Sequence, residues 1–143
     1  MINAQINKYQ NMGVTTASKE MLILLAYEGA IRFLNEARMH IEKGNVAQKC
    51  ERISRTMAII EELSSSLNME QGGEIAQNLR SLYEYMLIRL PEANLNSDVK
   101  ILHEVSSLLQ QLHEGWSEAM AKAAAPAPEV KKVASAPLAY VHG

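Results

Sequence analysis

Residues 18–44 read SKEMLILLAYEGAIRFLNEARMHIEKG, and this stretch decides the fold. Its apolar residues recur in steps of three and four, the spacing that places side chains on one face of a helix with 3.6 residues per turn. The stripe is unbroken and consists of Ile23, Tyr27, Ala30, Leu34, Ala37 and Ile41. Ser18 precedes it in the position of an N-cap, so the stretch predicts an amphipathic helix.

Three more segments carry the same spacing, separated by breaks at Gly44-Asn45, at Gly72-Gly73 and at Pro91 with the polar residues after it. The second stripe contains Val46, Cys50, Ile53, Met57, Ile60 and Leu67. The third contains Ile75, Leu79, Leu82, Met86 and Leu90, and the fourth contains Leu102, Val105, Leu109, Leu112 and Trp116.

The helix ends follow from the same breaks. Asn45 and Gln48 resemble a capping box for the second helix, and Asn96 or Ser97 is expected to cap the fourth. Pro91 has no N–H to donate to the carbonyl of Leu87, so the third helix is expected to end or kink there.

No segment alternates with period two, so we expect no sheet. Helices joined by short turns pack most simply side by side in alternating directions. The sequence therefore predicts an all-α protein, an antiparallel up-down four-helix bundle over residues 18–121.

Two flanking segments differ from the bundle. Residues 1–17 are mostly polar but contain Ile2, Ile6, Tyr9, Met12 and Val14, so they are either a frayed terminus or a detachable strap over apolar surface. Residues 122–143 hold three of the four prolines and many alanines, which is typical of a disordered tail.

Composition excludes several functional classes. The chain has 143 residues with 14 Lys+Arg against 16 Asp+Glu, which argues for one domain and against a general nucleic-acid binder. Cys50 is the single cysteine, so no internal disulfide is possible. The absence of a long apolar run or a signal-peptide core predicts a cytoplasmic protein without membrane insertion.

The sequence offers no catalytic or metal-binding pattern. No glutamate has a histidine three residues later, as di-iron bundles require. Glu36 and His40 share a helix face and are expected to form a surface ion pair, whereas His103 and His113 point in different directions. Without a phosphate loop as well, we expect no enzyme, no cofactor and no metal.

Two helices carry more apolar residues than one bundle core needs. The first has a second row of Leu22, Ala26, Gly29 and Phe33, and the third has a second row of Ala76, Tyr83 and Leu87. These rows either widen the contacts within the bundle or form an exposed groove for an amphipathic partner.

Residues 24–34, LLAYEGAIRFL, resemble the first-helix motif of the FliS family of flagellar export chaperones. The order and spacing of later segments agree, namely IIEEL at 59–63, LNMEQGGEIAQNL at 67–79, LYEYM at 82–86, Ala93-Asn94 and Trp116. The resemblance covers residues 5–120. The family usually has Leu-Tyr-Asp-Gly-Ala where this chain has Ala-Tyr-Glu-Gly-Ala at 26–30.

The resemblance implies a cytoplasmic, ATP-independent chaperone, a monomer or weak homodimer. It would bind the C-terminal segment of flagellin, prevent premature polymerisation and deliver it to a gate component of the flagellar type III export apparatus. By the same resemblance Ile6 and Tyr9 belong to a strap over the flagellin site, and the groove residues are Ile60, Leu63, Leu67, Ala76, Leu79 and Tyr83. An adaptor bundle with a different partner, or a bundle that carries a metal or cofactor, remains an alternative.

Overall fold

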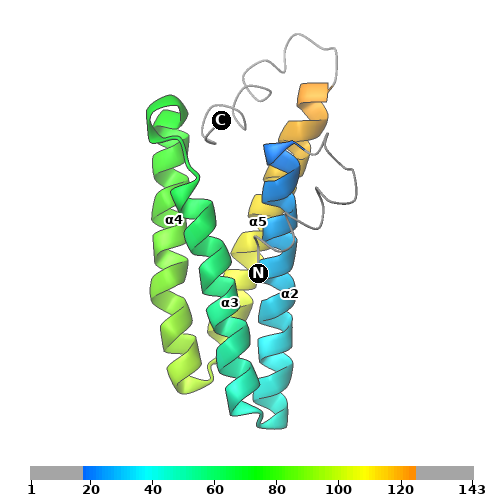
Figure 1. The fold of residues 1–143 in the computed structure, drawn as a ribbon, viewed down its shortest axis with the longest axis vertical. Helices are drawn as coiled ribbons and strands as arrows, with labels where there is room; N and C mark the ends of the chain where they lie inside the picture. Colours follow the sequence, from blue (N-terminus) through cyan, green and yellow to red (C-terminus); the bar gives the residue numbers. More distant parts are fainter. Residues whose placement is uncertain (1–17, 125–143) are drawn as a thin grey trace.

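The structure is a computed structural model that describes residues 18–124 of the chain. The predicted strap, with Ile6 and Tyr9, and nearly all of the predicted tail lie outside these residues. Within them the chain forms α2 (Lys19–Lys43), α3 (Val46–Ser65), α4 (Met69–Asn96) and α5 (Val99–Ala124), and no strand (Figure 1). The prediction of an all-α fold is confirmed.

The four helices form a ring of neighbours. α2 packs against α3 and α5, and α4 packs against the same two helices (Figure 1). The α2–α3 seam is the most extensive and the α4–α5 seam is the least. Because two or three residues connect successive helices, each helix runs back beside the previous one. The predicted four-helix bundle agrees with these contacts.

The bundle interior is one continuous apolar cluster that draws on all four helices. Its largest fully buried side chains include Tyr27, Tyr83, Leu34, Met86 and Leu109. Three predicted stripe residues lie outside it, because Val46 is 64 % exposed, Ile75 is 46 % exposed and Cys50 is only half-buried, and that part of the prediction is wrong. Val46 is the first residue of α3, and Ile75 lies two residues after the non-helical Gly73 of α4.

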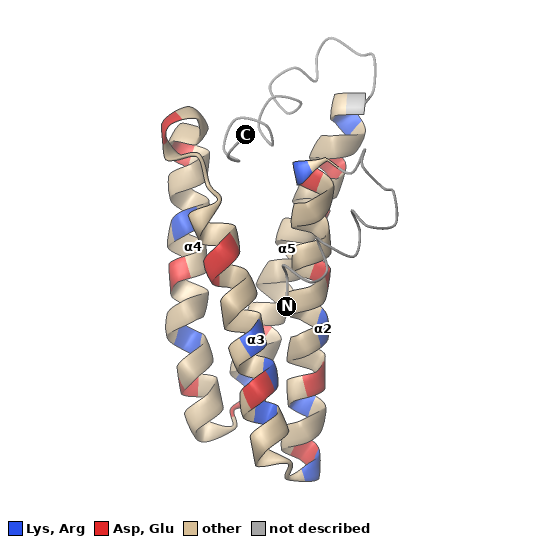
Figure 2. Cartoon of the chain, viewed as in Figure 1, with Lys and Arg blue, Asp and Glu red and all other residues tan. Residues whose placement is uncertain are grey.

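Charged residues of both signs alternate along the outer surfaces of the helices (Figure 2). No helix within residues 18–124 is long and apolar enough to cross a membrane.

Two of the predicted caps differ from those observed. Ser18 caps α2, where its Oγ accepts a hydrogen bond from the backbone N–H of Met21 at 3.1 Å. The capping box at Asn45 is wrong, because that side chain makes no cap bond and lies 3.2 Å from His40 Nδ1 instead. The cap at Asn96 or Ser97 is also wrong, since Asp98 Oδ1 accepts from the N–H of Lys100 at the start of α5.

The break between the second and third helices also differs from the prediction. α3 ends at Ser65, so Leu67 lies in the connection rather than on that helix. Gly73, with φ of 55° and ψ of −131°, separates the first turn of α4 from the rest. This backbone conformation suits glycine because a side chain would strain it.

The third helix does not end at Pro91, which was one of the two outcomes that the proline predicts. α4 continues to Asn96, and Gly73 is the position where its dihedral angles leave the helical region. Pro91 is exposed, so the carbonyl that loses its helical partner can bond to water at the surface.

Candidate partner-binding surface

The six residues predicted to line the groove all lie in the core. Ile60, Leu63, Leu67, Ala76, Leu79 and Tyr83 are between 0 and 8 % exposed. They come from α3, the α3–α4 connection and α4, so the structure brings them to one part of the core. Their role in partner binding stays a prediction, and a partner would have to uncover them first.

Tyr27 of α2 and Tyr83 of α4 meet inside the bundle. Their hydroxyl oxygens lie 2.6 Å apart, and the two residues are 0 and 2 % exposed. Buried hydroxyl groups require a hydrogen-bond partner, and each supplies one for the other. The motif tyrosine of the first helix is therefore a core residue that joins two helices on opposite sides of the ring.

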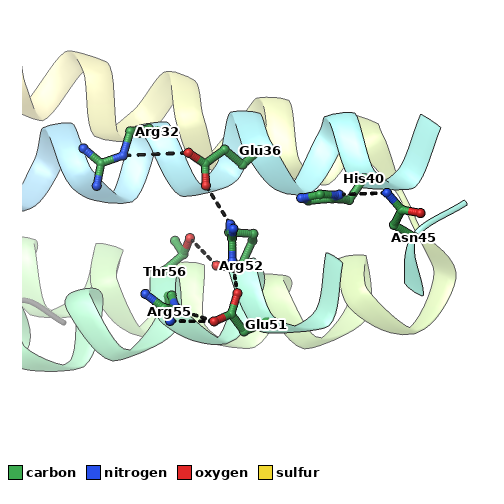
Figure 3. A network of polar contacts seen from close by, with 8 residues as sticks. All are labelled: Arg32, Glu36, His40, Asn45, Glu51, Arg52, Arg55 and Thr56. Atoms are coloured by element: carbon green, nitrogen blue, oxygen red, sulfur yellow. Dashed lines mark hydrogen bonds and ion pairs between the residues drawn. The ribbon is translucent and has the colours of Figure 1, made fainter. Parts of the chain in front are cut away.

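A polar network spans the α2–α3 seam (Figure 3). Glu36 of α2 accepts from Arg52 Nε of α3 at 2.7 Å and lies 3.9 Å from Arg32 Nε. Glu51 pairs with Arg52 and, at 2.6 Å, with Arg55. The prediction of a Glu36–His40 ion pair is wrong, because Glu36 pairs with Arg32 and Arg52 instead.

Two arginines of this network, Arg32 and Arg55, also lie over the aromatic ring of Phe33. The guanidinium carbons of Arg32 and Arg55 lie 5.1 and 5.7 Å from the ring centre of Phe33. Cations at such distances are attracted to an aromatic face. Phe33 is 6 % exposed, so this residue of the predicted second row is buried rather than exposed as a groove.

A second polar group joins α4 to α5. Glu104 accepts from the Tyr85 hydroxyl at 2.7 Å and from Arg89 Nε at 3.2 Å. The hydrogen bond from Tyr85, together with that from Arg89, lowers the pKa of Glu104 despite some desolvation. The same Tyr85–Glu104 bond raises the pKa of the tyrosine, because it favours the protonated phenol.

A buried lysine closes the end of the bundle that is remote from Ser18. Lys49 of α3 is 6 % exposed, and its Nζ donates to the Asn94 carbonyl at 2.8 Å and to Ser97 Oγ at 3.1 Å. These acceptors lie at the C-terminal end of α4, where the helix dipole favours a positive charge.

A groove follows the α2–α5 seam. It consists of two cavities of about 390 and 530 Å³, and Asn35 and Gln110 line both of them. Its apolar lining consists of Ile31, Leu34, Val99 and Leu102. Sequence reasoning missed this α2–α5 groove, because its polar residues are indistinguishable from an ordinary solvated helix face.

The two amide side chains that line both cavities of the α2–α5 groove, Asn35 and Gln110, are exposed. Within residues 18–124, the side chains of Asn35, Ser106, Ser107 and Gln110 make no hydrogen bond to the protein. Ser106 is only 8 % exposed and lines the cavity. Among the described residues Asn94 Oδ1 is the only buried side-chain nitrogen or oxygen without a partner, so the polar groups of the groove are open to water.

The histidines of α5 do not converge on one site. His113 Nε2 lies 2.8 Å from Glu28 Oε2 of α2, while His103 lines the other cavity of the α2–α5 groove. Among residues 18–124 no three His, Cys, Asp or Glu side chains are placed to hold one metal ion.

Comparison with known proteins gives consistent matches. The family model described as flagellar protein FliS matches residues 1–123. A flagellar secretion chaperone FliS from Salmonella typhimurium is 41% identical over 111 residues, covering 77% of this chain and 82% of the relative. The flagellar secretion chaperone FliSB of Pseudomonas aeruginosa is 41% identical over 103 residues, covering 72% of this chain and 82% of the relative. FliS of Bacillus subtilis is 31% identical over 112 residues, covering 78% and 83%.

Proposed function

This chain belongs to the FliS family of flagellar secretion chaperones, and from that premise we propose that it binds the C-terminal segment of flagellin. The family is one of chaperones and not of enzymes. In this proposal the chain works in the cytoplasm without ATP, as a monomer or weak homodimer. It keeps flagellin from polymerising and delivers it to a gate component of the type III export apparatus.

Family membership is the observation that carries the proposal. Relatives with 41% identity over most of both chains are named flagellar secretion chaperones, so an export substrate is the expected partner. An unfolded apolar segment gains stability when a bundle buries it, at about 25 cal/mol per Å² of apolar surface.

Titration calorimetry with a synthetic C-terminal segment of flagellin tests the proposal. We expect saturable binding to the full chain, and no binding of a peptide with the same composition in scrambled order. If neither peptide binds, or both bind equally, flagellin is not the specific partner.

The strap belongs to the same proposal. If Ile6 and Tyr9 cover the flagellin site, binding must first release them, and the observed affinity falls by the fraction of molecules that are open. Ile6→Ala with Tyr9→Ala should therefore raise the affinity, whereas Asn7→Ala with Lys8→Ala should not. Equal affinities of both double variants would reject the strap.

The six core residues are the proposed contacts once the site opens. Charged substitutions there would unfold the bundle, so truncations are the better test. Leu63→Ala and Leu79→Ala should weaken flagellin binding about tenfold in protein that still unfolds cooperatively, the equivalent of about 1.4 kcal/mol. Unchanged affinity in both folded variants would restrict these residues to the core.

A further inference from the structure

We propose that the bundle opens at one end only. The Ser18 end, which holds the starts of α2 and α4 and the ends of α3 and α5, separates, while the opposite Lys49 end stays closed. The four helices alternate in direction, so each runs from one of these ends to the other. Proteins open locally where their contacts are weakest, and the two ends differ in the contacts that join their helices.

Lys49 closes its end by capping a helix to which it does not belong. The last carbonyl groups of a helix have no partner within the helix. Lys49 of α3 donates to one of them, the Asn94 carbonyl of α4, and also to Ser97 Oγ in the connection to α5. A charged donor makes stronger hydrogen bonds than a neutral one, so these two contacts hold α3 to the end of α4.

The connection from α4 to α5 depends on these contacts for its shape. Ser97 has φ of 50° and ψ of 46°, in the left-handed region that residues other than glycine rarely adopt. Asn94 Oδ1, in the last turn of α4, is the one buried side-chain nitrogen or oxygen without a partner among residues 18–124. Both features cost stability, and the hydrogen bonds from Lys49 offset them. Loss of the ammonium group should therefore open this end.

Further polar pairs join different helices toward the Lys49 end and along the middle of the bundle. In order from the Lys49 end, these pairs are Glu36–Arg52, Arg89–Glu104, Tyr85–Glu104, Tyr27–Tyr83 and Glu28–His113. Hydrogen bonds have narrow limits of distance and angle, so even a small separation of the helices breaks them.

Toward the Ser18 end the buried residues of the described chain are apolar. They include Leu63 of α3, Leu67 of the connection, Ala76 and Leu79 of α4, and Trp116 of α5. Apolar contacts have no preferred direction. Helices that meet through them can move apart by small amounts without breaking a hydrogen bond between side chains.

α4 is the helix that we expect to move. Gly73 breaks its helical backbone after the first turn, and the α4–α5 seam is the least extensive of the four. At the Ser18 end, Figure 1 shows the start of α4 apart from the end of α5. A helix with this break and this seam can swing outward at the Ser18 end while Lys49 holds its other end.

Opening at the Ser18 end would uncover most of the proposed contacts for the export substrate. Leu63, Leu67, Ala76 and Leu79 lie in this half of the bundle and are buried in the closed chain. An apolar segment would enter from this end, and the closed Lys49 end would keep the four helices together. This use rests on the proposed function, whereas the one-ended opening is a property of the chain alone.

Two alanines of α4 form a matched pair of reporters. Ala76 in the Ser18 half and Ala93 beside Asn94 are both 0 % exposed. In the full chain with Cys50→Ser, each is replaced in turn by cysteine, and its labelling by a thiol reagent is timed. We expect Ala76→Cys to react at least tenfold faster than Ala93→Cys. Low concentrations of urea should leave the faster rate nearly unchanged, because a local opening exposes little surface.

Lys49→Met tests the closure at the other end, because it keeps a side chain of similar length and removes the ammonium group. It should speed the labelling of Ala93→Cys at least tenfold and leave that of Ala76→Cys within twofold. Lys43→Met is the control, since Lys43 is exposed near the same end. It should change neither rate by more than twofold.

Equal labelling of the two cysteines, or faster labelling of Ala93→Cys, would overturn the proposal, and so would a Lys49→Met that speeds both equally. If a cysteine variant does not unfold cooperatively, carbon-13 relaxation dispersion compares the methyl groups of the same alanines in the unsubstituted chain on the μs–ms timescale. Exchange at Ala76 and not at Ala93 supports one-ended opening, and the same behaviour at both overturns it. Flagellin takes no part in these measurements, so their failure leaves the proposed function standing.

Discussion

The hydroxyl oxygens of Tyr27 and Tyr83 lie 2.6 Å apart in the core, joining α2 to α4 across the bundle. These helices are not neighbours in the ring, because α3 and α5 separate them. The bond therefore links two helices that have no extensive seam in common. It also fixes the rotation of each helix about its axis, since both hydroxyls must point to the bundle centre.

Replacing either tyrosine with phenylalanine should lower the free energy of unfolding by about 1 kcal/mol, because each change removes a buried hydrogen bond and leaves the other hydroxyl without it. The double variant should lose less than the sum of the single losses, since both act on one bond. Urea unfolding of the four proteins measures this coupling. Strict additivity would show that the bond contributes nothing.

Ile60→Ala should destabilise the bundle by about 2–5 kcal/mol, because this side chain is fully buried and its removal leaves a cavity. Leu95→Ala is the matched control, since Leu95 is 85 % exposed and its truncation should change stability by less than about 0.5 kcal/mol. Denaturant midpoints measured without any partner compare the two. Equal effects would contradict the burial of Ile60 in the unliganded chain.

Gly73→Ala and Gly115→Ala should shift stability in opposite directions. Neither new methyl group would meet another atom within 4 Å, so the backbone decides. At Gly73, whose φ of 55° and ψ of −131° are rarely adopted by residues with a Cβ, the change should cost about 1–3 kcal/mol, whereas helical Gly115 should gain about 0.5–1 kcal/mol. Thermal unfolding measures the stability change of both variants. A stabilising Gly73→Ala would show that this backbone is not retained in solution.

Tyr85→Phe should raise the pKa of Glu104, because the Tyr85 hydroxyl is the main group that lowers it. A lowered carboxyl pKa in the folded state stabilises the protein above the unfolded value, and this contribution is lost as the pH falls through the folded value. The stabilities of the variant and the original chain should therefore converge in acid. NMR titration of the Glu104 carboxyl carbon measures the pKa, and an unchanged value would contradict the contact.

The helices and their packing were predictable because apolar spacing reports directly on which face is buried. The stripe through Tyr27 and Leu34 has one consistent period, and the observed α2 follows it. The residues that cap the helix ends were less predictable. Asn96, Ser97 and Asp98 are all good cap residues, so composition alone could not choose among them.

The candidate site was harder to predict for a different reason. The periodicity shows that Phe33 and Tyr83 each share a helix face with other apolar residues. Whether their side chains are buried depends on the neighbouring helices. Arg55 on α3 helps to cover Phe33, and Tyr27 on α2 bonds to Tyr83. Neither contact can be inferred from one helix alone. The α2–α5 groove was missed likewise, because two helices together create it.

Lys49 gives the chain an internal reporter of opening at the end of the bundle remote from Ser18. Amine-reactive reagents need an accessible, unprotonated amine, and this one is buried and engaged by Asn94 and Ser97. Exposed Lys43 and Lys100 should be labelled first. The rate at which Lys49 is acylated, followed by mass spectrometry, therefore measures how often α3 and α4 separate at this end, with and without a bound substrate.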